Sequence, residues 1–108
     1  MSNLYYANEK LTDAIYIFTI HEGDARRRIA AALGKLKVVT PRMLPEPLNK
    51  SYAEVMAKIE KGRRKGLKDM PDYTLPHIHN STASKLIAEI VRIQYEIEVL
   101  LMQKQEEN

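Results

Sequence analysis

The residues best suited to chemistry lie between positions 21 and 28, where the sequence reads HEGDARRR. This stretch places a histidine, two carboxylates and three consecutive arginines close together. A histidine beside an arginine can act as an acid–base catalyst on a phosphodiester. One hypothesis is therefore a small phosphodiesterase-like or RNase-like enzyme that uses His21 and Arg26. Because one helix is expected to end here and another to begin, these side chains should splay apart, so we assign no catalytic residue and favour a non-enzyme.

The three arginines fall at the start of a predicted helix that Asp24 is expected to cap. Free backbone N–H groups at a helix start, combined with guanidinium groups, can hold an anion. Three consecutive residues cover roughly 200° of a helix surface, however, so their surroundings differ. We expect Arg26 to lie beside the apolar stripe and to need an acidic partner, Arg27 to point to solvent and Arg28 to pair locally. The alternative is that nearby carboxylates offset three exposed cations at little cost.

A second basic stretch, KGRRKGLK, occupies residues 61–68. Five of its eight residues are basic, which suits contacts with phosphate groups that depend little on base sequence. Cations at the end of a helix also stabilise it, so the same stretch has a structural explanation. The predicted anion or nucleic-acid contacts are Arg26, Arg27, Arg28, Lys61, Arg63, Arg64 and Lys65.

Basic and acidic residues are unevenly distributed along the chain of 108 residues, whose net charge is +3. Residues 24–68 contain thirteen basic and four acidic side chains, whereas the segments before and after them are both net acidic. A basic block of this size is typical of proteins that contact nucleic acid or an acidic protein. If the acidic flanks fold against the block, they neutralise it, and the protein is a structural or assembly subunit with no anionic ligand. Both interpretations stay open at the level of the sequence.

The sequence gives no sign of a metal, a cofactor or a membrane span. The chain has no cysteine, and the segment HIH at 77–79 offers two histidines where zinc usually takes three or four ligands. The N-terminus lacks the features of a secretory signal, and no apolar run approaches the length of about 18 residues typical of a membrane span. We therefore expect no cofactor, no metal ion, no membrane contact and a cytoplasmic location.

The elements that must position these residues are helices, because apolar residues recur at helical spacing and never alternate strictly. We predict one helical domain over residues 1–108, with an all-α fold that is a small antiparallel bundle of three to four helices. Prolines separate the second helix from the third. The third helix could begin at Pro47, or at a capping box in SYAE where Ser51 and Glu54 bond to each other's backbone. The predicted helices cover residues 3–21, 24–37, 47–64 and 81–104.

The first and last predicted helices are apolar over more than one face. Each has a core stripe, and each carries further apolar residues and tyrosines beside that stripe, a setting in which tyrosine is enriched at interfaces. A helix that needs cover on two sides in so short a chain favours a second copy of the protein. The predicted core stripes are Leu4, Leu11, Ile15 and Phe18 in the first helix, and Leu86, Ile90, Ile93, Ile97 and Leu100 in the last. The predicted dimer interface consists of Ile17, Ile20, Ile87, Val91, Tyr95 and Met102.

These observations predict a non-enzymatic helical interaction module that forms a homodimer through the long C-terminal helix and part of the first helix. The basic central segment, residues 24–68, would contact nucleic acid or an acidic protein partner. A compact monomer, with the first and last helices at the centre of the bundle, is the alternative to the dimer.

Overall fold

The computed structural model describes residues 2–62 and 78–107, and every regular element in this part of the chain is helical. The elements are α1 (Ser2–Ile20), α2 (Ala25–Lys37), a short 3₁₀ helix η1 (Pro41–Met43), α3 (Leu48–Gly62) and α4 (Asn80–Glu107). The all-α prediction is confirmed over this part. None of the described helices is long and apolar enough to cross a membrane.

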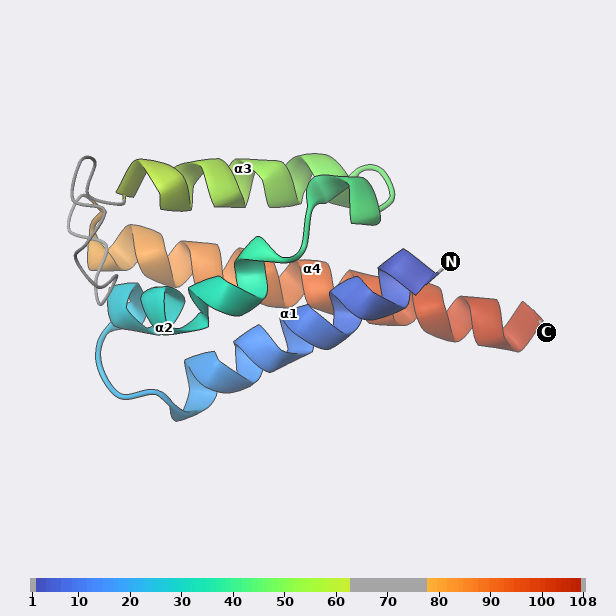
Figure 1. Cartoon of the computed structure of the whole chain (residues 1–108), viewed down its shortest axis with the longest axis horizontal. Helices are drawn as coiled ribbons and strands as arrows, with labels where there is room; N and C mark the ends of the chain where they lie inside the picture. The colour runs from blue at the N-terminus through green and yellow to red at the C-terminus, as the bar shows by residue number, and fades with distance from the viewer. Residues whose placement is uncertain (1, 63–77, 108) are drawn as a thin grey trace.

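The longest helix, α4, forms the axis on which the other helices pack. Both α1 and α2 pack against α4 and against each other, while α3 packs on α4 and on η1. Figure 1 shows that α1 and α4 run in opposite directions, so that the N-terminus of the chain lies near the C-terminal part of α4. The C-terminal end of α4 projects beyond the other helices, and the molecule measures 48 × 25 × 22 Å.

The core lies where α1, α2 and α4 meet, and it is closed on the side of α3 by Tyr52 and its neighbours. The predicted stripe of α3 (Leu48, Tyr52, Val55, Ile59) is buried as expected. In α1, two alanines lie at the centre of the buried face instead of at its edge, because small side chains let α2 and α4 approach closely. The buried residues of α1 are Ala7, Leu11, Ala14 and Phe18, whereas Leu4 and Ile15 are only partly buried.

The buried stripe of α4 departs from the predicted one at its C-terminal end. Leu86, Ile90, Ile93 and Ile97 are buried, but the next buried residue is Leu101, and Leu100 is only partly buried. A straight helix repeats every 3.6 residues, so a strict coiled-coil spacing drifts by about 20° every seven residues, or about 40° between Leu86 and Leu100. The expectation for Leu100 is therefore wrong by one position.

The start of α3 excludes the capping box. The backbone N–H groups of Lys50 and Ser51 both donate to the carbonyl oxygen of Pro47 at 3.2 Å, so the helix is already formed where Ser51 was expected to begin it. The Ser51 hydroxyl lies 3.5 Å from the same carbonyl and caps nothing. Of the two predicted starts, the one at Pro47 is correct to within one residue, because the fixed backbone angle of proline suits a helix start.

Candidate functional site

The carboxylate of Asp24 binds both a backbone N–H group and a guanidinium group at the start of α2. Oδ1 of Asp24 accepts a hydrogen bond from the backbone N–H of Arg27 at 3.2 Å, which confirms Asp24 as the N-cap. Oδ2 accepts from Nε and Nη2 of Arg26 at 3.2 and 2.8 Å. The acidic partner expected for Arg26 is thus the cap of its own helix. The bond from Arg26, followed by the bond from the Arg27 backbone, holds the pKa of Asp24 below its usual range.

Other donors at this helix start are also taken by the chain itself. The backbone N–H of Ala25 donates to Oδ1 of Asn80 at 2.8 Å, which ties the start of α4 to the start of α2. Nε of Arg28 donates to the carbonyl oxygen of Gly23 at 3.0 Å, the local pairing expected for this residue. An anion at the start of α2 would have to displace Asp24 or Asn80, which leaves this position less suited to anions than its sequence indicates.

Arg27 differs from its two neighbours because its guanidinium group has no partner in the described part of the chain. The aliphatic carbons of this side chain lie against the backbone of Gly23. A Cβ atom on Gly23 would lie 2.7 Å from Cδ of Arg27, and the backbone of Gly23 has a φ of +111°, which favours glycine. The aliphatic part of Arg27 therefore packs on a bare backbone, and the charged end is directed away from the protein, as predicted.

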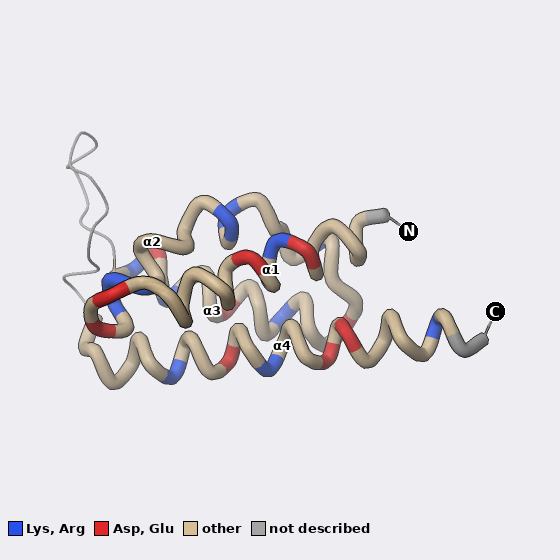
Figure 2. The backbone as a smooth tube through the Cα atoms, turned by 90° about the horizontal axis from the view of Figure 1, so that it is seen from below, with Lys and Arg blue, Asp and Glu red and all other residues tan. Residues whose placement is uncertain are grey.

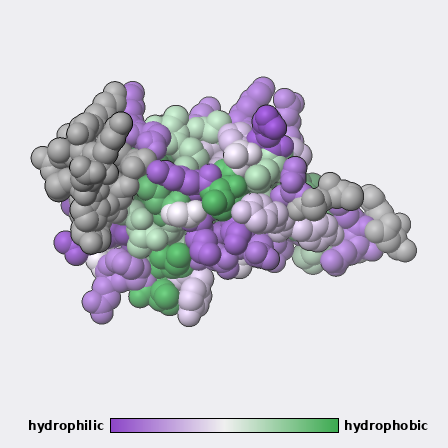
Figure 3. All heavy atoms as spheres, viewed as in Figure 1, coloured by the Kyte–Doolittle hydropathy of each residue, from purple (hydrophilic) through white to green (hydrophobic). Residues whose placement is uncertain are grey.

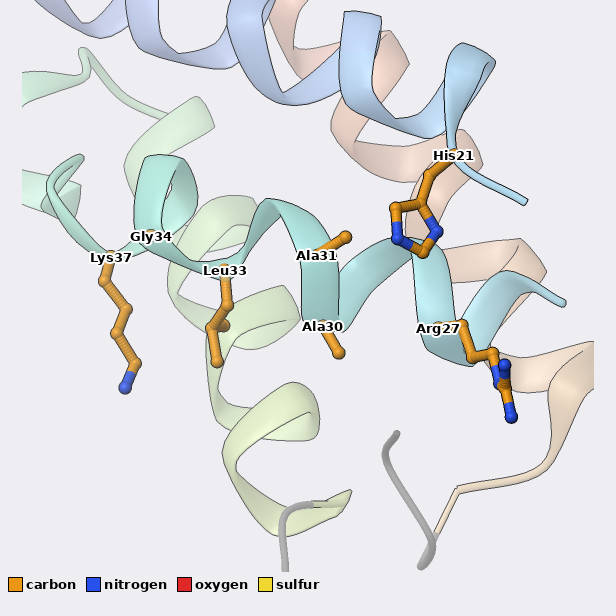
Figure 4. A pocket seen from close by; sticks show the side chains of 7 residues that line it. All are labelled: His21, Arg27, Ala30, Ala31, Leu33, Gly34 and Lys37. Carbon is orange, nitrogen blue, oxygen red and sulfur yellow. The ribbon is translucent and has the colours of Figure 1, made fainter. Parts of the chain in front are cut away.

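Arg27 forms one end of a groove along the outward face of α2, and Lys37 forms the other end (Figure 4). The groove has a volume of about 650 Å³. Small and apolar side chains separate the two cations, and His21 contributes from the end of α1. The described residues that line it are His21, Arg27, Ala30, Ala31, Leu33, Gly34 and Lys37.

The histidine and arginine of the enzyme hypothesis are not arranged as a pair. Arg26 is bound to Asp24, and the ring nitrogen Nδ1 of His21 donates to the carbonyl oxygen of Glu22 at 2.7 Å. The arginine that shares a groove with His21 is Arg27. No group of three or more potential metal ligands occurs among the described residues, and His77 of the HIH segment lies outside them.

The first basic stretch and the start of the second, Lys61 and Gly62, lie at the same end of the molecule. Asn80 bonds to Ala25, and Gly62 at the end of α3 lies so close to Ile78 that an added Cβ would be 3.1 Å from it. The start of α2, the end of α3 and the start of α4 therefore share one end, where Figure 2 shows several basic residues among acidic ones. Lys61 lies there and is exposed. The other predicted contacts in this stretch, Arg63, Arg64 and Lys65, lie outside the described residues.

The acidic flanks offset part of the basic segment. Asp13 of α1 lies 3.8 Å from Nζ of Lys35 in α2. Glu89 of α4 is held mainly by Arg92, which also pairs with Glu96, and the charge of Lys58 in α3 adds to the lowering of the pKa of Glu89. Within the described residues, internal neutralisation is local and does not reach the two cations of the groove.

A second surface is formed by the outward sides of α1 and α4. Nε2 of Gln94 lies at its centre, 3.1 Å from Oδ1 of Asn8, 3.4 Å from Oγ1 of Thr12 and 2.9 Å from Oε2 of Glu98. By helical phase, exposed apolar side chains flank this polar seam on both helices. They are Tyr5 (50% exposed) and Tyr16 (63%) on α1, and Val91 (41%), Tyr95 (64%) and Met102 (57%) on α4. These five residues are named the α1–α4 face below.

The six predicted interface residues lie in three different settings. Val91, Tyr95 and Met102 belong to the α1–α4 face, whereas Ile17 and Ile87 are partly buried against the core. Ile17 follows Asn8 by nine residues, which places it about half a turn away, on the side of α1 that meets α2. Ile20 is exposed at the end of α1, where Figure 3 shows hydrophobic residues on the surface.

The predicted interface residues do not include Tyr5, and Tyr16 enters the prediction only as one of the tyrosines beside the core stripe of the first helix. Tyr5 and Tyr16 are both exposed and are eleven residues apart, which is three turns of a helix. This spacing places the two tyrosines on one face of α1, which the sequence alone could have shown. The sequence could not show which side of α1 would be covered by α4.

Comparisons with protein-family models, with curated proteins and with solved structures found no match for this chain. The class of protein is therefore defined by its own structure: an all-helical chain with exposed apolar side chains on two helices and a groove that Arg27 and Lys37 line on a third.

Proposed function

We propose that this chain is a non-enzymatic interaction module that forms a homodimer through the α1–α4 face and contacts an anionic partner through its basic segment. The main support for the dimer is the α1–α4 face, in which five large apolar side chains are 41–64% exposed around one polar seam. Several large apolar side chains gathered on one exposed face are typical of protein–protein contacts, whereas single ones scattered over a surface are not.

The composition of the face fits a contact between proteins. Tyrosine and methionine are enriched in interfaces, where an aromatic ring packs while its hydroxyl group stays near water. A hollow of about 390 Å³ lies beside Tyr95, between the start of α3 and the middle of α4, and could take a side chain of the partner. In a two-fold dimer the same face serves both copies, so an aromatic residue next to a hollow can be self-complementary.

Measuring the mass of the chain in solution tests the dimer. By sedimentation equilibrium we expect the parent to approach twice the chain mass of 12.4 kDa. Tyr95→Glu should shift the equilibrium toward the monomer, because it places a charge within the apolar contact. Ala57→Glu, on the exposed side of α3, is the matched control and should behave as the parent. A parent that stays monomeric at high micromolar concentration would remove the dimer from the proposal.

The contact with an anionic partner is supported by cations that the chain leaves unpaired. Arg27, Lys37 and Lys61 have no partner in the described part of the chain, whereas Arg26 and Arg28 do. The enzyme alternative has weaker support, because Arg26 is bound to Asp24. The assembly-subunit alternative requires neutralisation of the basic segment, and the pair between Asp13 and Lys35 is a local instance of it.

A further inference from the structure

The groove on α2 contains a glycine that the fold of the chain does not require. Glycine is less favourable in a helix interior than any residue except proline. Gly34 lies inside α2 and is exposed, and a Cβ atom added to it would meet nothing within 4 Å. Gly23 and Gly62 differ, because an added Cβ would come within 3.1 Å or less of a neighbouring side chain at both positions. A bare backbone on an exposed helix face lets the backbone of another helix approach closely.

The two cations of the same groove are unpaired among the described residues, whereas the neighbouring cations of α2 are paired. Arg26, Arg28 and Lys35 are each engaged, by Asp24, by the carbonyl oxygen of Gly23 and by Asp13. Arg27 and Lys37 have no such partner among the described residues. They are ten positions apart, which is about 15 Å along the helix axis. No carboxylate occurs among the described residues that line the groove, so its charge complements an acidic partner.

We propose that α2 docks an acidic amphipathic helix of a partner protein, which crosses α2 at Gly34 and places carboxylates against Arg27 and Lys37. This inference names the class of anionic partner, and so it rests on the proposed function. Figure 4 shows the two cations at opposite ends of the groove, with alanine and leucine side chains between them. Small apolar side chains of a docked helix fill such a floor, as in other helix-in-groove complexes.

The floor of the groove favours a protein helix over nucleic acid. A phosphate backbone is bound by a track of cations and hydrogen-bond donors, and single strands are also bound by aromatic side chains that stack on bases. The α2 residues between Arg27 and Lys37 are Ala30, Ala31, Leu33 and Gly34, which provide neither, and the one imidazole among the described lining residues, His21, comes from the end of α1. Binding energy there must come from burial of apolar surface, which a helix supplies.

Two labelled probes test the inference by fluorescence anisotropy. One is a fluorescein-labelled, lactam-closed peptide with alanine and leucine on one helical face and glutamate on the other. The second is fluorescein-labelled oligothymidylate. We expect the parent to bind the peptide, and Gly34→Leu to weaken that binding by about tenfold or more, because the new side chain fills the crossing point. Leucine forms helices better than glycine, and the added side chain lies in open space. The melting temperature of the Gly34→Leu variant should therefore not be lower than that of the parent.

Charge variants provide the matched control. The double variant Arg27→Glu with Lys37→Glu should abolish peptide binding, whereas Lys50→Glu with Lys85→Glu, an equal change of charge outside the groove, should weaken it about twofold or less. Equal binding of the peptide by the parent and Gly34→Leu would overturn the inference. Binding of oligothymidylate without the peptide would also overturn it but would leave the proposed anionic contact in place. If neither probe binds the parent, the proposed contact with an anionic partner is wrong as well. The dimer is tested separately, by the mass of the parent in solution.

Discussion

At the start of α2, the two carboxylate oxygens of Asp24 serve different partners. Oδ1 accepts from the backbone N–H of Arg27, and Oδ2 accepts from the guanidinium group of Arg26. The arginine placed at the positive end of the helix dipole is therefore compensated by the residue that caps the helix. Arg27, one position later, is left with its charge free for a partner.

Replacement of Asp24 should have an effect that depends on pH. Because the folded protein lowers the pKa of this carboxyl group, its ionised form stabilises the fold above the unfolded value near 4, and this contribution is lost as the pH falls through the lower folded value. Asp24→Asn keeps a good N-cap but loses the ion pair. We expect its melting temperature to lie below that of the parent at pH 7, with a difference that shrinks below about pH 4.

The comparison is made by following thermal unfolding with circular dichroism from neutral to acidic pH. Asp24→Ala removes the cap as well, so it should be less stable than Asp24→Asn throughout this range. A difference between the parent and Asp24→Asn that stays constant down to pH 2 would show that the ion pair has no role.

Tyr52 is the buried polar group that connects α3 to α2. Its hydroxyl group donates to the carbonyl oxygen of Leu36 at 2.6 Å, near the end of α2, and burial raises the pKa of this tyrosine. Tyr52→Phe should lower the free energy of unfolding by about 1 kcal/mol, since the ring still fills its site but the hydrogen bond is lost. Urea unfolding measures the change. Tyr6→Phe removes a hydroxyl group from an exposed side chain of α1 outside the α1–α4 face and should leave stability unchanged; an equal loss in both variants would contradict this role of Tyr52.

At the scale of helices, two glycines should respond to alanine in opposite ways. Gly34→Ala fills open space on α2 and should stabilise the protein by about 1 kcal/mol. Gly62→Ala would bring a Cβ to 3.1 Å from Cδ1 of Ile78 and should destabilise it by about 1 kcal/mol or more. Denaturant unfolding of the two variants side by side checks the signs. Stabilisation by Gly62→Ala would show that the end of α3 and Ile78 are not tightly packed.

The sequence predicts the helices well and their ends less well. Helical periodicity reflects burial, so the stripe around Tyr52 in α3 and the stripe from Leu86 to Ile97 in α4 follow from spacing alone. The capping box at Ser51 failed because a local pattern does not exclude a helix that has already begun upstream. Asp24 succeeded as a cap because Gly23, with its positive φ, separates it from α1.

The candidate surfaces were only partly predictable, because periodicity gives the faces of a helix but not the neighbours that cover them. Ile17 and Tyr16 are adjacent in sequence, yet Ile17 packs on the core and Tyr16 is exposed. The three consecutive arginines, by contrast, are distinguished by helical phase, which predicts a partner for Arg26 and for Arg28 and solvent for Arg27. What phase does not give is the identity of the partners, which are Asp24 and the carbonyl oxygen of Gly23.

At the scale of the whole molecule, the two surfaces involve different helices. The α1–α4 face carries exposed aromatic and aliphatic side chains, and the groove on α2 has small residues between two cations that are unpaired in the described part of the chain. A module with this arrangement can self-associate through one surface and keep the other open for an acidic partner. Charge changes in the groove should therefore leave the mass of the dimer unaltered.

The most direct measurement of the central claim is the fluorescence of Tyr95→Trp. The chain has no tryptophan, so this variant places a single reporter on the α1–α4 face and keeps an aromatic side chain at a position that is 64% exposed in one copy. We expect an emission maximum shifted to the blue at high protein concentration, because the ring is buried between two copies, and a return to the solvent-exposed value on dilution. Ala57→Trp on α3 should show a solvent-exposed maximum throughout. A Tyr95→Trp spectrum that is solvent-exposed at every concentration would contradict the account.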